Sequence, residues 1–140
     1  MSDDSVVADT MVMSWRLREQ PPAISAAYDE LIGDASVLVS FQTAMELQFG
    51  AVNAGWGELR TRRLQRRLTQ YVVVRPDEKT IAVCAQLRYD CKKAGHALAA
   101  KDHVGDLWIA ATAVRLGVPL VSDDGIFEAV PGLRLLSGDT

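Results

Sequence analysis

The sequence has few of the residues that covalent cross-links or membrane anchoring require. It contains only two cysteines, Cys84 and Cys91, in a segment with a helical pattern. At ~1.5 Å per residue these side chains would lie ~10 Å apart along the helix axis, which is too far for a disulfide. No stretch reaches the ~18 apolar residues of a membrane span, and residues 1–10 lack the pattern of a secretion signal. We therefore expect a reduced, cytoplasmic protein that does not enter a membrane.

An excess of positive charge is also lacking. The chain has 15 Lys and Arg against 18 Asp and Glu, giving a net charge of −3. Proteins that hold nucleic acid by a bulk positive field are usually strongly basic, so any nucleic-acid contact must be local. The remaining composition, 49% hydrophobic and 24% charged over 140 residues, is that of a globular protein. This length suits a single domain, 1–140, around one core.

Short apolar runs alternate with helical patterns along the chain. The runs lack an alternation of polar and apolar residues, which is typical of strands buried on both faces of a parallel sheet. They lie at 5–9, 36–41, 71–74, 119–122 and 133–136. Helices are expected at 11–19, 22–32, 43–53, 56–70, 77–94 and 104–116. Strands that alternate with helices predict a layered α/β fold.

Acidic residues occur near the ends of these elements in four separate segments. Asp9 ends the first strand, and Glu46 lies one turn into the helix after the second strand. Asp106 begins the helix at 104–116, and Asp123 and Asp124 follow the fourth strand. Ligands of open α/β sheets bind beyond the carboxyl ends of the strands, so these acids predict one shared site. An oxygen-rich site of this kind selects Mg²⁺ or Mn²⁺ over zinc.

Each acid also has a purely structural explanation. Asp9 would cap the helix that follows it, and TAME at 43–46 matches a capping box between Thr43 and Glu46. Asp106 suits a helix N-terminus, and SDDG at 122–125 is a good turn sequence. Taken singly, these explanations suffice. They do not explain why four caps meet at one sheet edge, or why Asp106 heads the buried stripe of its helix, where an ionised group needs a partner.

The motifs that carry these acids resemble those of the PIN domain family, the PilT N-terminal type of nuclease, and in particular its VapC-like toxin branch. VVADTMV, FQTAMELQFGA, DLWIAATAVRLGVPLVSDDGIF and VPGLRLL occur in the family's order and spacing. The resemblance implies a three-layer α/β/α fold with a central, mainly parallel sheet of four to five strands. It also implies a Mg²⁺- or Mn²⁺-dependent endoribonuclease, the toxin of a type II toxin–antitoxin pair. Its partners would be RNA, an antitoxin and a second copy of the chain.

The same resemblance assigns roles to individual residues. It implies that metal binding and catalysis belong to four acids: Asp9, Glu46, Asp106 and Asp124. It gives supporting roles to Thr10, Ser122 and Asp123. Either Asp123 or Asp124 is the fourth acid, and the distance to Phe127 favours Asp124.

The segment ELRTRRLQRRL at 58–68 is the main concentration of positive charge. Arg60, Arg63 and Arg67 lie along one side of the expected helix. They would form a solvated helix face, a phosphate track for RNA or a docking site for an acidic partner. Outside this segment, we expect His96 and His103 to be surface or hydrogen-bonding residues and the three tryptophans to pack in cores or interfaces.

Other functions fit parts of the same pattern. A PIN-type nuclease that processes RNA outside a toxin system would need the same acids. A non-catalytic interaction module would use a metal only for stability. Phosphotransfer on a receiver-like fold also uses aspartates at strand ends, but no adjacent acid pair closes the first strand and no lysine ends a late strand.

Overall fold

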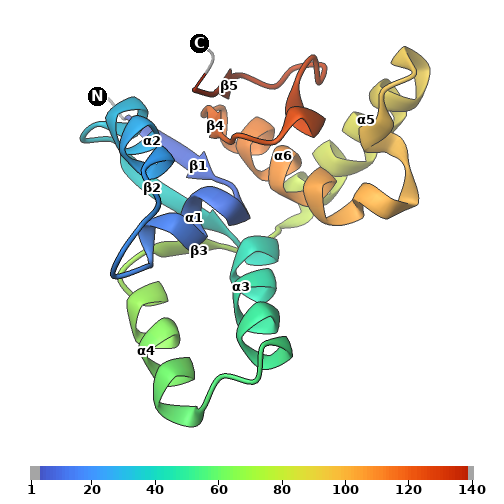
Figure 1. Ribbon diagram of the computed structural model, residues 1–140. Helices are drawn as coiled ribbons and strands as arrows, with labels where there is room; N and C mark the ends of the chain where they lie inside the picture. The colour runs from blue at the N-terminus through green and yellow to red at the C-terminus, as the bar shows by residue number, and fades with distance from the viewer. Residues whose placement is uncertain (1–3, 139–140) are drawn as a thin grey trace.

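The computed structural model of the protein describes residues 4–138 as a five-stranded sheet with helices on both faces (Figure 1). The strands are β1 (Ser5–Ala8), β2 (Ser36–Ser40), β3 (Val72–Val74), β4 (Leu120–Val121) and β5 (Leu135–Leu136). Every neighbouring pair is parallel, in the order β3-β2-β1-β4-β5. The expected three-layer α/β/α fold with a parallel sheet is confirmed.

The α-helices of residues 4–138 form where the sequence pattern predicts them; the one at 104–116 has the expected ends, and each of the others has one or both ends shifted. They are α1 (Thr10–Arg16), α2 (Ile24–Ile32), α3 (Phe41–Asn53), α4 (Glu58–Leu68), α5 (Glu78–Ala94) and α6 (Val104–Leu116). Three short 3-10 helices, which the pattern did not predict, are η1 (Ala97–Ala99), η2 (Lys101–His103) and η3 (Gly125–Phe127). Helix α3 begins two residues before the expected position because the Ser40 side chain caps it by accepting the Gln42 N–H.

Successive residues of β1 pack into different clusters on the two faces of the sheet. Val7 belongs to one core with residues of α5 and α6 such as Leu87 and Ile109. Val6 and Ala8 belong to a second core with residues of α1 and α2. The alternation follows from the two-residue period of a strand, and it explains why Val6, Val7 and Ala8 of β1 are all apolar.

Helices α3 and α4 form a hairpin that extends away from the sheet (Figure 1). Their contact is a small cluster of buried residues, Ala51, Leu64 and Leu68, against which Trp56 and Leu17 pack. Leu17 closes α1, so this cluster also ties the hairpin to the start of the chain. The hairpin therefore stands as one wall beside the carboxyl edge of the sheet.

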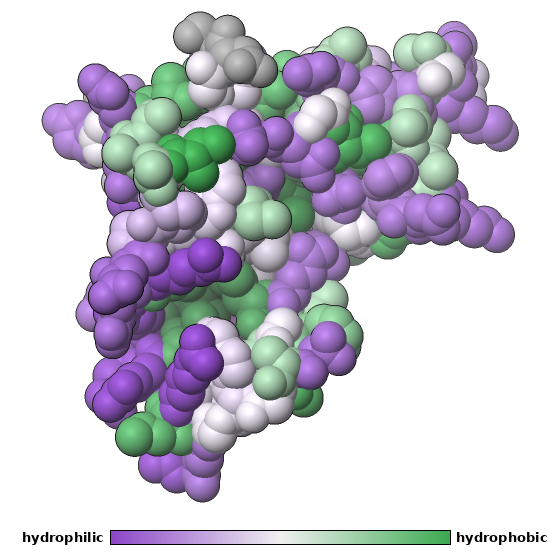
Figure 2. All heavy atoms as spheres, in the orientation of Figure 1, coloured by the Kyte–Doolittle hydropathy of each residue, from purple (hydrophilic) through white to green (hydrophobic). Residues whose placement is uncertain are grey.

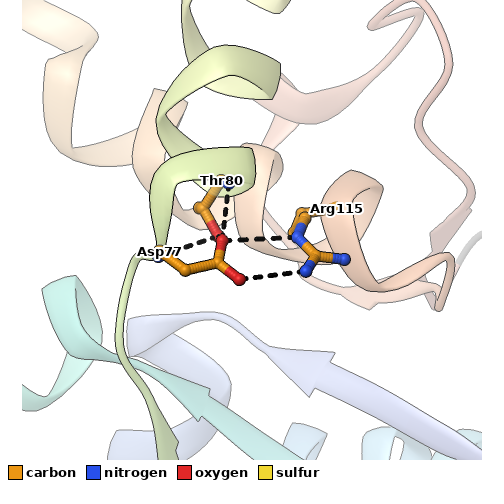
Figure 3. A network of polar contacts seen from close by, with 3 residues as sticks. All are labelled: Asp77, Thr80 and Arg115. Atoms are coloured by element: carbon orange, nitrogen blue, oxygen red, sulfur yellow. Dashed lines mark hydrogen bonds and ion pairs between the residues drawn. The ribbon is translucent and has the colours of Figure 1, made fainter.

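A polar network joins the start of α5 to the end of α6 (Figure 3). The Asp77 carboxylate accepts the Thr80 N–H at 2.8 Å and the Arg115 Nη2–H at 2.9 Å. The hydrogen bond from Arg115 is the main reason that the pKa of Asp77 lies well below its usual range. Just beyond Arg115, Gly117 ends α6 with a φ of 69°, a conformation that favours glycine. This network fixes α6, whose other end carries Asp106.

Both cysteines are buried and unpaired, as their spacing predicted. Burial raises the pKa of both thiols, which keeps them protonated and inert. Within residues 4–138, no helix is long and apolar enough to cross a membrane.

Candidate functional site

A cleft of about 1350 Å³ lies at the carboxyl edge of the sheet, between α1, α3, α4 and the start of α6. Figure 2 shows part of it as a hollow with an apolar floor between hydrophilic rims. Its acidic lining consists of Asp9, Glu46, Asp106 and Asp124, together with Glu19. The structure thus brings together the four acids that the sequence suggested, from four separate segments.

Asp9 is the most deeply buried of these acids, with 4% of its surface exposed. It follows β1 and caps α1, accepting the Val12 N–H at 2.9 Å through Oδ1, while Oδ2 accepts the Ser122 hydroxyl. Burial is the main cause of its raised pKa of about 6, although both hydrogen bonds lower it. The charges of Asp124 and Asp106 raise the pKa further. Asp9 therefore caps a helix and also contributes a carboxylate to the cleft.

Glu46 is held by hydrogen bonds to both of its carboxylate oxygens. Thr10 donates its hydroxyl to Oε1 at 2.5 Å, and Gln42 donates its amide N–H to Oε2 at 2.8 Å. The proposed capping box at TAME is wrong, because Ser40 caps α3 and Thr43 lies within the helix. Glu46 is consequently free of a capping role and projects into the cleft from one turn inside α3.

Asp106 lies in the first turn of α6, with its Oδ2 3.1 Å from Nδ1 of His103. Burial is the main cause of its raised pKa; the hydrogen bond from His103 lowers it, and the charges of Asp124 and Glu46 raise it. Gly105 lets this helix approach α3 closely. A Cβ atom at position 105 would lie 2.7 Å from Nε2 of Gln42 and 2.9 Å from Oε2 of Glu46, so a larger residue there would require the ends of these two side chains to shift.

Asp123 and Asp124 face different surroundings. Asp124 lines the cleft, its N–H donates to Ser122 Oγ at 3.0 Å, and its Oδ1 accepts the Ile126 N–H at 3.0 Å. Asp123 is outside the cleft lining, and its Oδ1 accepts the Tyr28 hydroxyl at 2.5 Å. The loop after β4 therefore presents Asp124, the residue favoured by the sequence, to the other acids.

The chemistry of this lining suits a hard divalent cation. Its carboxylates supply only oxygen donors, and Asp9 and Asp106 each have a pKa raised by burial and by neighbouring negative charge. Bound positive charge would relieve that repulsion. As the side chains are placed in residues 4–138, no three His, Cys, Asp or Glu residues are grouped closely enough to form a metal site. The donor set fits Mg²⁺ or Mn²⁺, whereas the ligand geometry is not assembled.

Arginines line the opposite part of the cleft. They come from the end of α1 and from α4: Arg18, Arg60, Arg63, Arg66 and Arg67. Arg60 lies over the Trp56 ring, with its Cζ 3.8 Å from the ring centroid. Arg67 instead donates to the backbone carbonyl of Leu17 and links α4 to α1. The three arginines proposed for RNA thus all line the cleft, but Arg67 already has a structural partner.

Sequence reasoning missed four residues that shape the site: Gln42, Gly105, Tyr28 and Arg18. Gln42 lies in the FQTAMELQFGA motif and donates to Glu46 four positions later, whereas the other three act on residues distant in sequence or line the cleft from another segment. His103 was expected only to make surface or hydrogen-bonding contacts, and its contact with Asp106 is of that kind. His96 likewise binds the Glu128 carbonyl oxygen at 2.7 Å through its ring. The i,i+3 spacing of His103 and Asp106 and the i,i+4 spacing of Gln42 and Glu46 were the available signals.

Comparisons with known proteins agree with this fold. A model of the PIN domain family matches residues 6–133. The solved structure of FitAcB from Neisseria gonorrhoeae is 28% identical, with a TM-score of 0.73, and the match covers 95% of this chain and 97% of that one. DNA-bound VapBC from Salmonella typhimurium is 21% identical, with a TM-score of 0.78 and coverage of 96% and 98%.

A third structure, VapBC-5 from Mycobacterium tuberculosis, is described as a member of the VapBC family of toxin–antitoxin systems. It is 24% identical, with a TM-score of 0.69, and the match covers 96% of this chain and 98% of that one. No curated protein sequence matches the chain.

Proposed function

The chain belongs to the PIN domain family, and from this premise we propose that it is a metal-dependent endoribonuclease and the toxin of a type II toxin–antitoxin pair. One observation carries the proposal: four acids from four segments line one cleft whose other wall carries arginines. The acids suit a metal, and the arginines suit the phosphates of RNA. Residues 1–140 would act as one domain, in the reduced cytoplasm that suits two unpaired cysteines.

In this proposal Asp9, Glu46 and Asp106 hold the cation, and Asp124 holds a second ion or the attacking water. When bound, Mg²⁺ or Mn²⁺ would acidify a water molecule and neutralise charge that develops on the phosphate. Asp9 must be ionised to act as a ligand, so its pKa of about 6 predicts weaker metal binding at acidic pH.

The supporting residues orient these carboxylates. Ser122 donates to Asp9 and also accepts the Asp124 N–H, so one hydroxyl bridges two of the acids. Thr10 donates to Glu46 from the residue next to Asp9. These hydrogen bonds hold the acids near one another in spite of their repulsion.

Cleavage of labelled RNA tests this function. The parent should cut single-stranded or structured RNA with Mg²⁺ or Mn²⁺ and stop in EDTA. Asp9→Asn, Asp106→Asn and Asp124→Asn should each abolish cutting. Asp123→Asn is the matched control, because it changes a neighbouring acid outside the cleft and its amide oxygen still accepts from Tyr28. Cutting that survives EDTA and all three substitutions would overturn the proposal.

The antitoxin is expected to occupy the same cleft. Its apolar floor includes Leu17, Leu47 and Ile109, and its acidic end would attract one basic side chain. We expect a segment that combines apolar residues with such a side chain to inhibit the enzyme. Co-purification with the product of the neighbouring reading frame, followed by the RNA assay, tests this partner. A stable complex that cuts RNA as fast as the free protein would contradict it.

Homodimerisation is the remaining part of the proposal. The outer face of α3 exposes Met45, Phe49 and Val52 by 50%, 61% and 72%, at positions that share one side of the helix. Burial of this exposed apolar stripe against a second copy of the chain would be energetically favourable. Light scattering should give twice the chain mass for the parent and a shift towards monomer for Phe49→Glu. A monomer at every concentration of the parent would refute the dimer.

A further inference from the structure

Trp56 and Arg60 form a stacked pair at the hairpin end of the cleft. Trp56 lies between α3 and α4, packed against the cluster of Ala51, Leu64 and Leu68. Arg60 rises from the first turn of α4 and lies over the indole ring at 3.8 Å. This distance is van der Waals contact, so the ring holds the guanidinium in place and lowers the entropy that it would lose on binding a ligand.

The Arg60 guanidinium keeps its hydrogen-bonding groups available. Within residues 4–138 it makes no hydrogen bond or ion pair, because the nearby Glu58 pairs with Arg62 instead. Arg60 is also exposed to solvent. A planar cation supported on one face and exposed elsewhere is a surface on which a second flat group can stack.

An unpaired nucleobase is the flat group that the surroundings favour. Bases of single-stranded RNA stack on guanidinium planes, whereas bases in a duplex are already stacked on their neighbours. Arg63 and Arg66 line the same cleft and suit the flanking phosphates. The arginines would also attract an acidic peptide, but the exposed flat face of Arg60 is suited to stacking of a nucleobase.

The position of the pair relative to the acids sets its distance from the reacting phosphate. Helix α3 runs from Glu46 to its end at Asn53, roughly 10 Å along its axis, and Trp56 follows. We propose that Arg60, supported by Trp56, is a base-stacking subsite for one unpaired nucleotide of single-stranded RNA, at the hairpin end of the cleft.

This inference rests on the proposed ribonuclease function, and its test is separate from cleavage. Fluorescence anisotropy in EDTA would measure the binding of eight-nucleotide single-stranded RNAs in which one abasic residue is moved along the chain. The parent should lose about tenfold in affinity when the abasic residue falls at the stacked position. Arg60→Lys retains the charge but removes the plane, so it should bind the intact RNA about tenfold more weakly and respond to no abasic position.

Arg63→Lys is the matched control, because the same change falls on a cleft arginine with no ring contact. It should keep the position-dependent loss of the parent. The salt dependence of binding should be the same for the parent and Arg60→Lys, since the number of charges is unchanged. Thermal melts check that all variants are folded.

Two outcomes, each in a protein that still cuts RNA, would overturn the inference while leaving the function intact. In the first, the affinity of the parent does not depend on the position of the abasic residue. In the second, the Arg60→Lys protein still binds most weakly when the abasic residue falls at one position. If Arg60→Lys binds RNA normally but loses affinity for the antitoxin, the pair serves that partner and the inference is wrong. If the parent cuts no RNA but its affinity for RNA still depends on the position of the abasic residue, the nuclease function would be refuted and the stacking subsite retained.

Discussion

Replacement of Asp9 by asparagine should stabilise the metal-free protein at neutral pH. Burial raises the pKa of this carboxyl from its usual 3.8 to about 6 in the folded state. The folded protein therefore binds the proton more tightly than the unfolded chain does, and ionisation of Asp9 lowers the free energy of unfolding. The contribution of the proton is fully present below pH ~4 and is lost as the pH rises through about 6.

At ~1.36 kcal/mol per pKa unit, this loss is about 3 kcal/mol above pH ~7. An asparagine side chain at this position would have no ionisation to oppose folding. Its amide oxygen can still accept the Val12 N–H, and its amide nitrogen can donate to Ser122. Even if one hydrogen bond worth ~1 kcal/mol is weakened, a net gain of about 2 kcal/mol remains.

Urea denaturation in EDTA measures this difference directly. The free energy of unfolding of Asp9→Asn should exceed that of the parent by about 2–3 kcal/mol at pH 8 and by little at pH 4.5. Asp34→Asn, which changes an exposed acid far from the cleft, controls for the change in net charge. Added Mg²⁺ should stabilise the parent and not Asp9→Asn. An Asp9→Asn protein that is less stable than the parent at pH 8, or a difference independent of pH, would refute the reasoning.

Three further substitutions probe the shape of the site. Asp106→Asn should melt in EDTA at or above the melting temperature of the parent, because burial already raises the pKa of Asp106. Its melting temperature should rise less than that of the parent when Mg²⁺ is added. If Asp106 were only a helix cap, the substitution would instead lower the stability by up to ~1 kcal/mol, with no dependence on metal. Gly105→Ala should fold but cut RNA up to ~100-fold more slowly, since its Cβ would require the ends of the Gln42 and Glu46 side chains to shift. Normal cutting would show that the close approach is unimportant. Tyr28→Phe removes the hydroxyl that holds Asp123, so it should cost ~1 kcal/mol in urea denaturation and reduce cleavage more than that loss explains, and cleavage equal to the parent would contradict a positioning role.

Much of the fold could be predicted because its signals are local. Apolar runs mark strands that are buried on both faces, and Gly117 marks the end of α6. The gathering of the acids also follows from topology, since parallel strands bring their carboxyl ends to one edge. The start of α3 was misplaced because Phe41 belongs to the apolar run by composition, whereas the cap at Ser40 begins the helix there.

The finer geometry of the site could not be predicted because it depends on contacts between distant segments. The hydrogen bond that holds Asp123 comes from the Tyr28 hydroxyl on α2, 95 positions earlier in the chain. The close approach of position 105 to the Gln42 and Glu46 side chains arises only when α6 packs beside α3. Local propensity carries no information about either contact, since both depend on how the layers pack.

The small core of the α3–α4 hairpin gives the two walls of the cleft different resistance to local unfolding. Acids such as Asp9 and Asp106 are attached to elements that pack into the two large clusters of the sheet. The arginine wall on α4 depends mainly on the cluster of three buried residues and on the bond from Arg67 to Leu17. Segments with few buried contacts open at a lower free-energy cost than the global unfolding of the protein. We therefore expect α4 to exchange its backbone amide hydrogens with solvent at a lower free-energy cost than the elements that carry Asp9 and Asp106.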